Sequence, residues 1–125
     1  MSDPYALFAI LEKEPSDMEA TLAASDGFEE AGESDVAFAL RWMVKFHRHP
    51  HLRKAGERRN YWQWDCGPLR ISHLIPSNRC ALPYALFRQM AGVHAGACHY
   101  SESYETAVRS LAIGLAALKK ELAIQ

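Results

Sequence analysis

The sequence predicts an α+β domain in which three N-terminal helices precede a small antiparallel sheet with an inserted short helix, followed by a long C-terminal helix that packs on the sheet. Apolar residues recur at helical spacing up to residue 47, strand-like alternation begins at residue 60, and helical spacing returns after residue 103. The 125 residues fit a single domain, 1–125. Within it, residues 1–49 are expected to be helical and 60–125 to hold a hairpin, the short helix, a further strand and the long helix.

The first two helices are marked by their ends. The first is expected over Pro4–Glu14, because proline is favoured at the first helical position. The second begins at a capping box, in which Ser16 accepts from the amide of Glu19 and Glu19 reaches back to the amide of Ser16. Gly32 supplies the left-handed conformation that ends a helix, so the second helix is expected to end near Ala31.

The third helix is apolar around much of its circumference and is expected to be the central packing helix. Ser34 or Asp35 caps its start, and Pro50 stops it. The segment Pro50–Asn60 that follows is polar and basic, so it is expected to be a loop or a frayed helix end.

The predicted sheet begins with a hairpin. Tyr61–Cys66 alternates aromatic and polar residues, and Gly67-Pro68 separates it from Leu69–Ile75. A third strand is expected at Ala97–Tyr100, which would give a sheet of two or three strands.

Two helices complete the predicted fold. The inserted short helix is expected over Leu82–Met90. Ser101 or Ser103 caps the long final helix. Its continuous apolar stripe consists of Tyr104, Ala107, Val108, Leu111, Leu115, Leu118 and Leu122.

Charge is distributed unevenly along the chain. Residues 1–40 carry ten acidic side chains and one basic one, a net charge of −9, whereas residues 41–79 carry nine basic and two acidic ones, a net charge of +7. The favoured interpretation is that the two segments attract each other in the folded protein. The alternative is a basic surface that meets a polyanion.

Composition and cysteine usage narrow the class of protein. Hydrophobic residues make up 49% and charged residues 23%, which is typical of a globular domain and excludes a disordered or collagen-like chain. Three cysteines, Cys66, Cys80 and Cys98, are an odd number at non-motif spacing, so reduced thiols are expected. No leader-like segment and no apolar run long enough for a membrane span is seen, so the cytoplasm is the expected compartment.

The sequence contains no established catalytic or nucleotide-binding motif and predicts neither an enzyme nor a cofactor. His47, His49 and His51 alternate and would face one side of an extended chain, which makes a small metal-binding protein one alternative. The favoured interpretation is that the helical period scatters these rings, so no metal site is predicted. A nucleophilic dyad of Cys66 and His73 is conceivable but has no supporting motif.

A basic and aromatic segment follows the third helix. Phosphates could pair with its basic groups while an unpaired base stacks on an aromatic ring, so single-stranded nucleic-acid binding is another alternative. The candidate binding residues are Arg48, Arg53, Lys54, Arg58, Arg59, Tyr61, Trp62 and Trp64. For Trp62 and Trp64 the favoured interpretation is burial in the core, because residues two apart on a strand share a face.

A residue pattern in residues 1–45 points to a bacterial family. It comprises Ala6–Ile10, then Glu14–Asp17, and then Leu22–Glu33. In the last run the matching positions are Asp26, Glu29, Glu30 and Gly32. The pattern resembles the repeat-companion domain, a short N-terminal module abundant in planctomycetes, and the resemblance is looser over the later hairpin and final helix.

That resemblance implies a helical interaction or regulatory module and supplies no catalytic residues. Together with the missing motifs, it leads us to expect a non-enzymatic protein-interaction or regulatory module whose partner is another protein. Its contact surface is expected at the basic loop or at an acidic face formed by Asp26, Glu29, Glu30 and Glu33.

Overall fold

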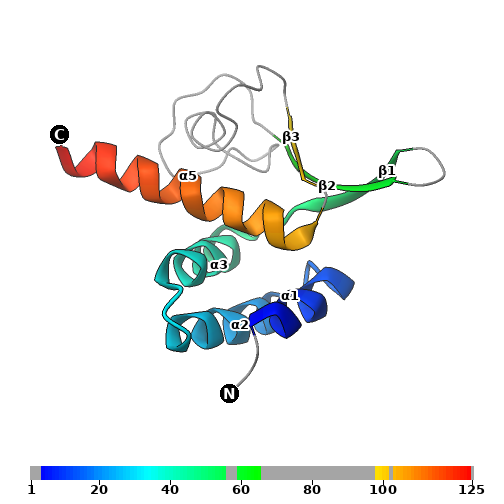
Figure 1. Ribbon diagram of the computed structural model, residues 1–125, viewed down its shortest axis with the longest axis horizontal. Coiled ribbons are helices and arrows are strands. Elements are labelled where there is room, and N and C mark those ends of the chain that lie inside the picture. Colours follow the sequence, from blue (N-terminus) through cyan, green and yellow to red (C-terminus); the bar gives the residue numbers. More distant parts are fainter. Residues whose placement is uncertain (1–3, 56–58, 66–97, 102, 125) are drawn as a thin grey trace.

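A long C-terminal helix lies between a small antiparallel sheet and the other helices in the computed structural model, which describes residues 4–55, 59–65, 98–101 and 103–124 (Figure 1). This arrangement confirms the α+β class. The described elements are α1 (Pro4–Lys13), α2 (Met18–Glu30), α3 (Ser34–Phe46), β1 (His51–Ala55), β2 (Arg59–Asp65), β3 (Cys98–Ser101) and α5 (Tyr104–Ile124). The expected short helix at 82–90 lies outside the described residues.

The start of α2 differs from the predicted capping box. The N-cap is Asp17, whose side chain accepts from the amide of Ala20 at 3.0 Å, so the assignment of the cap to Ser16 and Glu19 was wrong. The carbonyl oxygen of Asp17 accepts hydrogen bonds from the amide of Thr21 at 3.1 Å and from the hydroxyl of Thr21 at 2.8 Å. The first helical hydrogen bond therefore starts one residue later than expected.

Both α2 and α3 end in the same backbone motif, in which a left-handed residue follows the helix. After α2 that residue is Gly32, with φ 84°, and the next amide donates to the carbonyl of Phe28 at 2.9 Å. After α3 it is His47, with φ 53°, and the amide of Arg48 donates to the carbonyl of Met43 at 2.9 Å. The third helix therefore ends before the expected stop at Pro50. Its N-cap, Glu33, makes no side-chain capping bond, so the expected cap at Ser34 or Asp35 is also wrong.

The segment 50–60, expected to be a loop, contains β1, and this expectation was wrong. β1 pairs antiparallel with β2, placing Leu52 opposite Trp62 and Lys54 opposite Asn60. Pairing with an aromatic strand overrides the weak strand pattern of the basic sequence, because strand propensity depends strongly on the neighbouring strand.

β2 is the central strand, since the sheet order is β1-β2-β3. β3 pairs with its other side, with Trp64 opposite His99, which confirms the third strand. The observed hairpin is therefore formed by β1 and β2. Its expected second arm, residues 69–75, lies outside the described residues.

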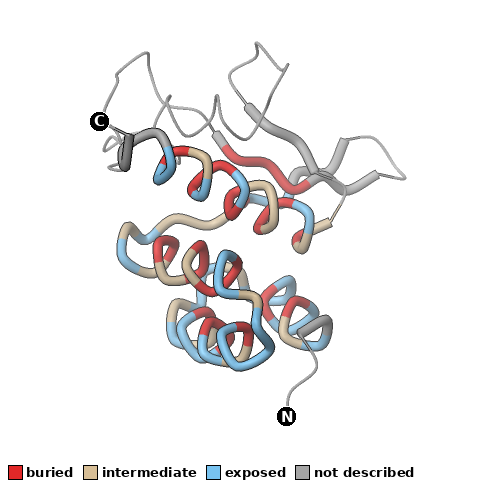
Figure 2. The backbone as a smooth tube through the Cα atoms, turned by 60° about the vertical axis from the view of Figure 1, so that its left-hand side comes forward, coloured by how far each residue is buried: buried red, intermediate tan, exposed pale blue. Residues whose placement is uncertain are grey.

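The core forms where α5 passes between the sheet and the other helices (Figures 1 and 2). Trp62 and Trp64 are buried, which confirms their interpretation as core residues. The indole N–H of Trp64 donates to the carbonyl of Ala107 in α5 at 2.9 Å. The Trp62 ring meets Tyr104 edge-on with centroids 5.1 Å apart.

The other side of α5 packs on the N-terminal helices. The Phe8 ring of α1 lies 4.7 Å from that of Phe28 in α2 and 6.4 Å from that of Tyr104, centroid to centroid. The expected cap of the final helix is confirmed at Ser103, whose hydroxyl accepts from the amide of Thr106 at 3.1 Å. Among the described residues, no helix has the length and apolarity needed to cross a membrane.

The two matched helix ends predict opposite responses to substitution. Replacing His47 with Gly removes the cost of holding a residue with a Cβ atom at φ 53°, so His47→Gly should raise the free energy of unfolding by about 0.5–1 kcal/mol. Gly32→Ala introduces that cost at φ 84°, although no atom lies within 4 Å of the new methyl group. It should lower the free energy of unfolding by about 1 kcal/mol. Urea unfolding of both variants measures the changes, and equal signs would contradict the assignment.

Tyr104 predicts an alkaline sensitivity. Burial raises the pKa of its phenol, and among the described residues its hydroxyl has no hydrogen-bond partner. A raised folded pKa gives stability that is complete below the unfolded pKa of about 10 and is lost as pH rises above it. Tyr104→Phe should therefore be as stable as the parent or more stable at pH 7. Between pH 10 and 11 its free energy of unfolding should fall less steeply, by up to about 1.4 kcal/mol per pH unit. Parallel slopes in urea melts across this range would contradict the prediction.

Candidate interaction groove

A groove runs between the α2–α3 corner and the exposed side of α5. Its main hollow has a volume of about 420 Å³ and is lined by residues 32–36 of the corner and by Arg109, Ala112, Ile113 and Ala116 of α5. An adjoining hollow of about 240 Å³ shares Ser34, Asp35, Ala112 and Ala116 with it and continues towards Lys119. We call these two hollows together the α3/α5 groove.

Local sequence explains why the groove exists. Gly32 turns the chain sharply after α2, so α3 starts close to α5. Ala112 and Ala116 are four residues apart and therefore lie on the same side of α5. Their short side chains leave open the space that larger residues would fill.

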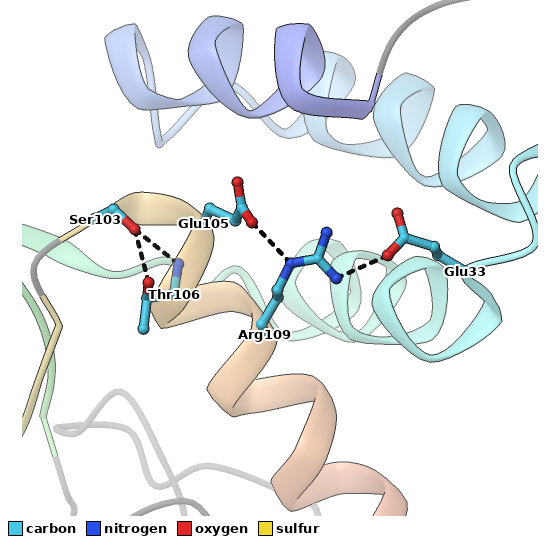
Figure 3. Close-up of polar contacts among 5 residues, drawn as sticks. All are labelled: Glu33, Ser103, Glu105, Thr106 and Arg109. Carbon is cyan, nitrogen blue, oxygen red and sulfur yellow. Dashed lines mark hydrogen bonds and ion pairs between the residues drawn. The ribbon is translucent and has the colours of Figure 1, made fainter.

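One arginine ties the corner to α5. Arg109 donates from Nη1 to Glu33 at 2.7 Å and from Nε to Glu105 at 3.0 Å (Figure 3). Its guanidinium also lies 5.5 Å from the centroid of the Phe8 ring. The hydrogen bond to Glu33 is the main cause that raises the pKa of Arg109, and the bond to Glu105 adds to it, while partial burial opposes both. The cation is therefore held in place at one end of the groove.

A second arginine lies at the other end of the groove. Arg41 of α3 lies 3.3 Å from a carboxylate oxygen of Asp26 and 3.7 Å from one of Glu29, both on α2. These groups are largely exposed, so the pairs stabilise the fold only weakly. Nearby, the ammonium group of Lys119 lies 4.2 Å from the centroid of the Phe38 ring.

The rim of the groove carries an unusual apolar side chain. Ile113 is 65% exposed, more than any other large hydrophobic residue in the part of the chain that the structure describes. It stands beside the buried side chains of Val36 and Ala112 in the groove lining. Together with Val36, Ala112 and Ala116 it makes this part of the groove lining apolar.

The structure brings the predicted acidic face together at this corner. Asp26, Glu29 and Glu30 are exposed on α2, and Glu33 is half-buried at its end. With Asp35 they form what we call the acidic corner. Sequence reasoning had proposed the first four of these residues as an acidic face, but did not include Asp35, Arg109 or Ile113, because the final helix showed only its apolar stripe.

The predicted attraction between the acidic and basic segments is present in limited form. Arg41 of the basic segment makes salt bridges with Asp26 and Glu29 of the acidic segment. Glu33 pairs with Arg109 of the final helix, which lies outside both segments.

The basic and aromatic candidates for nucleic-acid binding are not assembled into a stacking surface by the described residues. Trp62 and Trp64 are buried, so the alternative in which their rings stack on unpaired bases is wrong. Arg48 is half-buried, with Nη1 3.4 Å from the carbonyl oxygen of His47. Arg58 lies outside the described residues. The remaining candidates, Arg53, Lys54, Arg59 and Tyr61, are described by their backbone only, in β1 and β2.

The histidine triplet does not converge. His47 ends α3, whereas the rings of His49 and His51 lie against each other with centroids 4.8 Å apart. Nδ1 of His49 lies 2.9 Å from the carbonyl oxygen of Pro50. Within residues 4–55, 59–65, 98–101 and 103–124, no three His, Cys, Asp or Glu residues are placed to hold a metal ion together. The proposed dyad of Cys66 and His73 lies outside the described residues.

No protein-family model, no curated protein and no solved structure matches this chain.

The Arg109 bridge predicts a measurable and salt-sensitive coupling. In a double-mutant cycle, Glu33→Gln and Arg109→Met should show a coupling free energy of about 0.5–1 kcal/mol at low salt, since both groups are about one-third exposed. Added NaCl should reduce it by screening. A matched cycle with Glu12→Gln, an exposed carboxylate on α1 outside this bridge, should give no coupling. Equal coupling in the two cycles would contradict a direct interaction.

Proposed function

We propose that this chain is a non-enzymatic protein-interaction module, in keeping with the resemblance to the repeat-companion domain, and that it docks its partner in the α3/α5 groove. The observation that carries the proposal is the position of Ile113, which is 65% exposed at the edge of an apolar hollow. Burying that side chain and the hollow beside it would supply the hydrophobic contribution that protein association needs.

The charge of the surrounding surface favours a protein partner over a nucleic acid. The carboxylates of Glu29, Glu33 and Asp35 line the groove together with three cations, Arg41, Arg109 and Lys119, so its lining gives phosphates no net attraction. Its arginines are engaged with carboxylates, Arg41 with Asp26 and Arg109 with Glu33. A polyanion would have to break these pairs before binding.

The groove also supports recognition better than chemistry. Among its described residues, the ionisable groups are held in ion pairs or exposed to solvent. The pKa that clearly departs from its ordinary value is that of Arg109, and it is raised above a value that is already high. A general acid or base works best with a pKa near the working pH. The floor of alanine and valine provides shape and apolar contact for a partner side chain.

The proposal is tested by capture of a partner with groove and control variants. The full chain, immobilised, is exposed to a lysate of the organism that encodes it, and the retained proteins are identified by mass spectrometry. Ile113→Glu should reduce recovery of the specific partner about tenfold, because it places a charge beside the apolar hollow that the partner would cover. Ile10→Glu is the matched control, since Ile10 is 57% exposed on α1 and does not line the groove.

Recovery of the partner should be unchanged with Ile10→Glu, and circular dichroism should show both variants folded. A partner retained equally by the parent and by Ile113→Glu would contradict docking in the groove. Retention of nucleic acid in place of protein, weakening steeply as salt increases, would contradict the proposed class of partner.

A further inference from the structure

Two histidine rings lie in contact between α3 and β1, away from the groove. We infer that His49 and His51 form a two-nitrogen site for a divalent transition metal ion that favours imidazole ligands. We call these two residues the histidine pair. The site adds a ligand to the chain and depends neither on the α3/α5 groove nor on the partner proposed for it.

The end of α3 decides which histidines come together. Helical spacing would scatter the rings, but α3 ends at Phe46, so that spacing reaches His47 and not the histidine pair. His49 precedes Pro50 and is therefore favoured in an extended conformation, and β1 begins at His51. Residues two apart in an extended chain lie on the same side. Pro50 is buried and its ring fixes φ, which holds the backbone between the two histidines.

The hydrogen bond of His49 identifies the nitrogen that can bind a metal. Nδ1 lies 2.9 Å from the carbonyl oxygen of Pro50. Because a carbonyl oxygen accepts and never donates, Nδ1 carries the proton, and in the neutral ring Nε2 carries the lone pair. A histidine that ligates a metal commonly donates its other ring N–H to a backbone carbonyl, which orients the ring and raises the basicity of the ligating nitrogen. His49 already makes that hydrogen bond.

The separation of the two rings fits a shared ion. A metal ion about 2.0–2.1 Å from an imidazole nitrogen lies about 3.2 Å from the centroid of that ring. Two rings that bind one ion at an angle of about 90–110° therefore have centroids about 4.5–5.2 Å apart. The rings of the histidine pair are 4.8 Å apart and tilted by 52°. The tilt excludes face-to-face stacking, in which the rings present their faces and not their nitrogen edges to each other.

Exposure and ligand type indicate the class of ion. His51 is exposed and His49 is half-buried, so an ion reaches the pair from solvent. Imidazole nitrogen suits zinc, copper and nickel, whereas magnesium and calcium prefer oxygen ligands. Because the pair supplies two ligands and water supplies the others, binding should be reversible and weaker than at a closed structural zinc site.

Titration of the full chain with zinc chloride tests the site. Isothermal titration calorimetry should show saturable binding of about one zinc ion per chain. His49→Gln and His51→Gln should each weaken this binding at least about tenfold, because each removes one of two protein ligands. His47→Asn is the matched control, since His47 is exposed and asparagine tolerates its left-handed conformation, and it should weaken binding less than about twofold.

Nuclear magnetic resonance of the ring nitrogens identifies the coordinating atoms. Zinc should shift the Nε2 resonance of His49 while its Nδ1 stays protonated, and should shift one ring nitrogen of His51. A contact that only packs the two rings together would leave these resonances unchanged when zinc is added. Circular dichroism of the three variants confirms that the comparison is made on folded protein.

The outcomes that would overturn the site are distinct from those that bear on the groove. Absence of saturable zinc binding, or coordination of zinc through Nδ1 of His49, would overturn it. Binding that the three histidine variants weaken equally, or that none of them weakens, would indicate adventitious zinc only and would overturn it as well. The lysate capture with Ile113→Glu decides the proposed function separately, because Ile113 lies on α5 and not in the histidine pair.

Discussion

α5 is buried from two sides at once, and this constraint organises the whole structure. The sheet contributes Trp62 and Trp64 to one side, and the indole of Trp64 bonds to the α5 backbone at 2.9 Å. On the other side, Phe8 and α3 pack against the same helix. Because a hydrophobic contact stabilises only when both partners are in place, neither the N-terminal helices nor the described strands form a complete core without α5.

Much of the fold could be predicted from the sequence because its signals are local. Helical spacing and terminal residues located all four described helices to within a few residues, and Ser103 was recognised as the cap of α5. β1 could not be predicted in this way, because its basic sequence becomes a strand through pairing with β2. The N-cap of α2 moved from Ser16 to Asp17 because two adjacent residues offer similar capping oxygens, and backbone geometry alone decides between them.

The candidate site, too, could be predicted from the sequence only where its residues are close together in the chain. Asp26, Glu29, Glu30 and Glu33 could be proposed as an acidic face because their charges are close together in sequence. The groove was not, because it is formed by residues 32–36 and 109–116, which only the packing of α5 brings together. Arg109 and Glu33 are 76 residues apart, and a single arginine within an apolar helical stripe carries no sequence signal for such a contact. Ile113 belongs to the other side of that helix and is recognised as unusual only once its exposure is known.

The double pairing of Arg109 also fixes how α5 is rotated about its own axis. A shift of one residue along the helix turns a side chain by about 100°, which would withdraw the guanidinium from Glu33. The residues that hold α5 in position are therefore different from Ile113 and Ala116, which face outward at the groove. Substitutions at those two positions can alter the shape of the groove without repacking the core. The shape of the groove is in this way separable from the architecture that holds it.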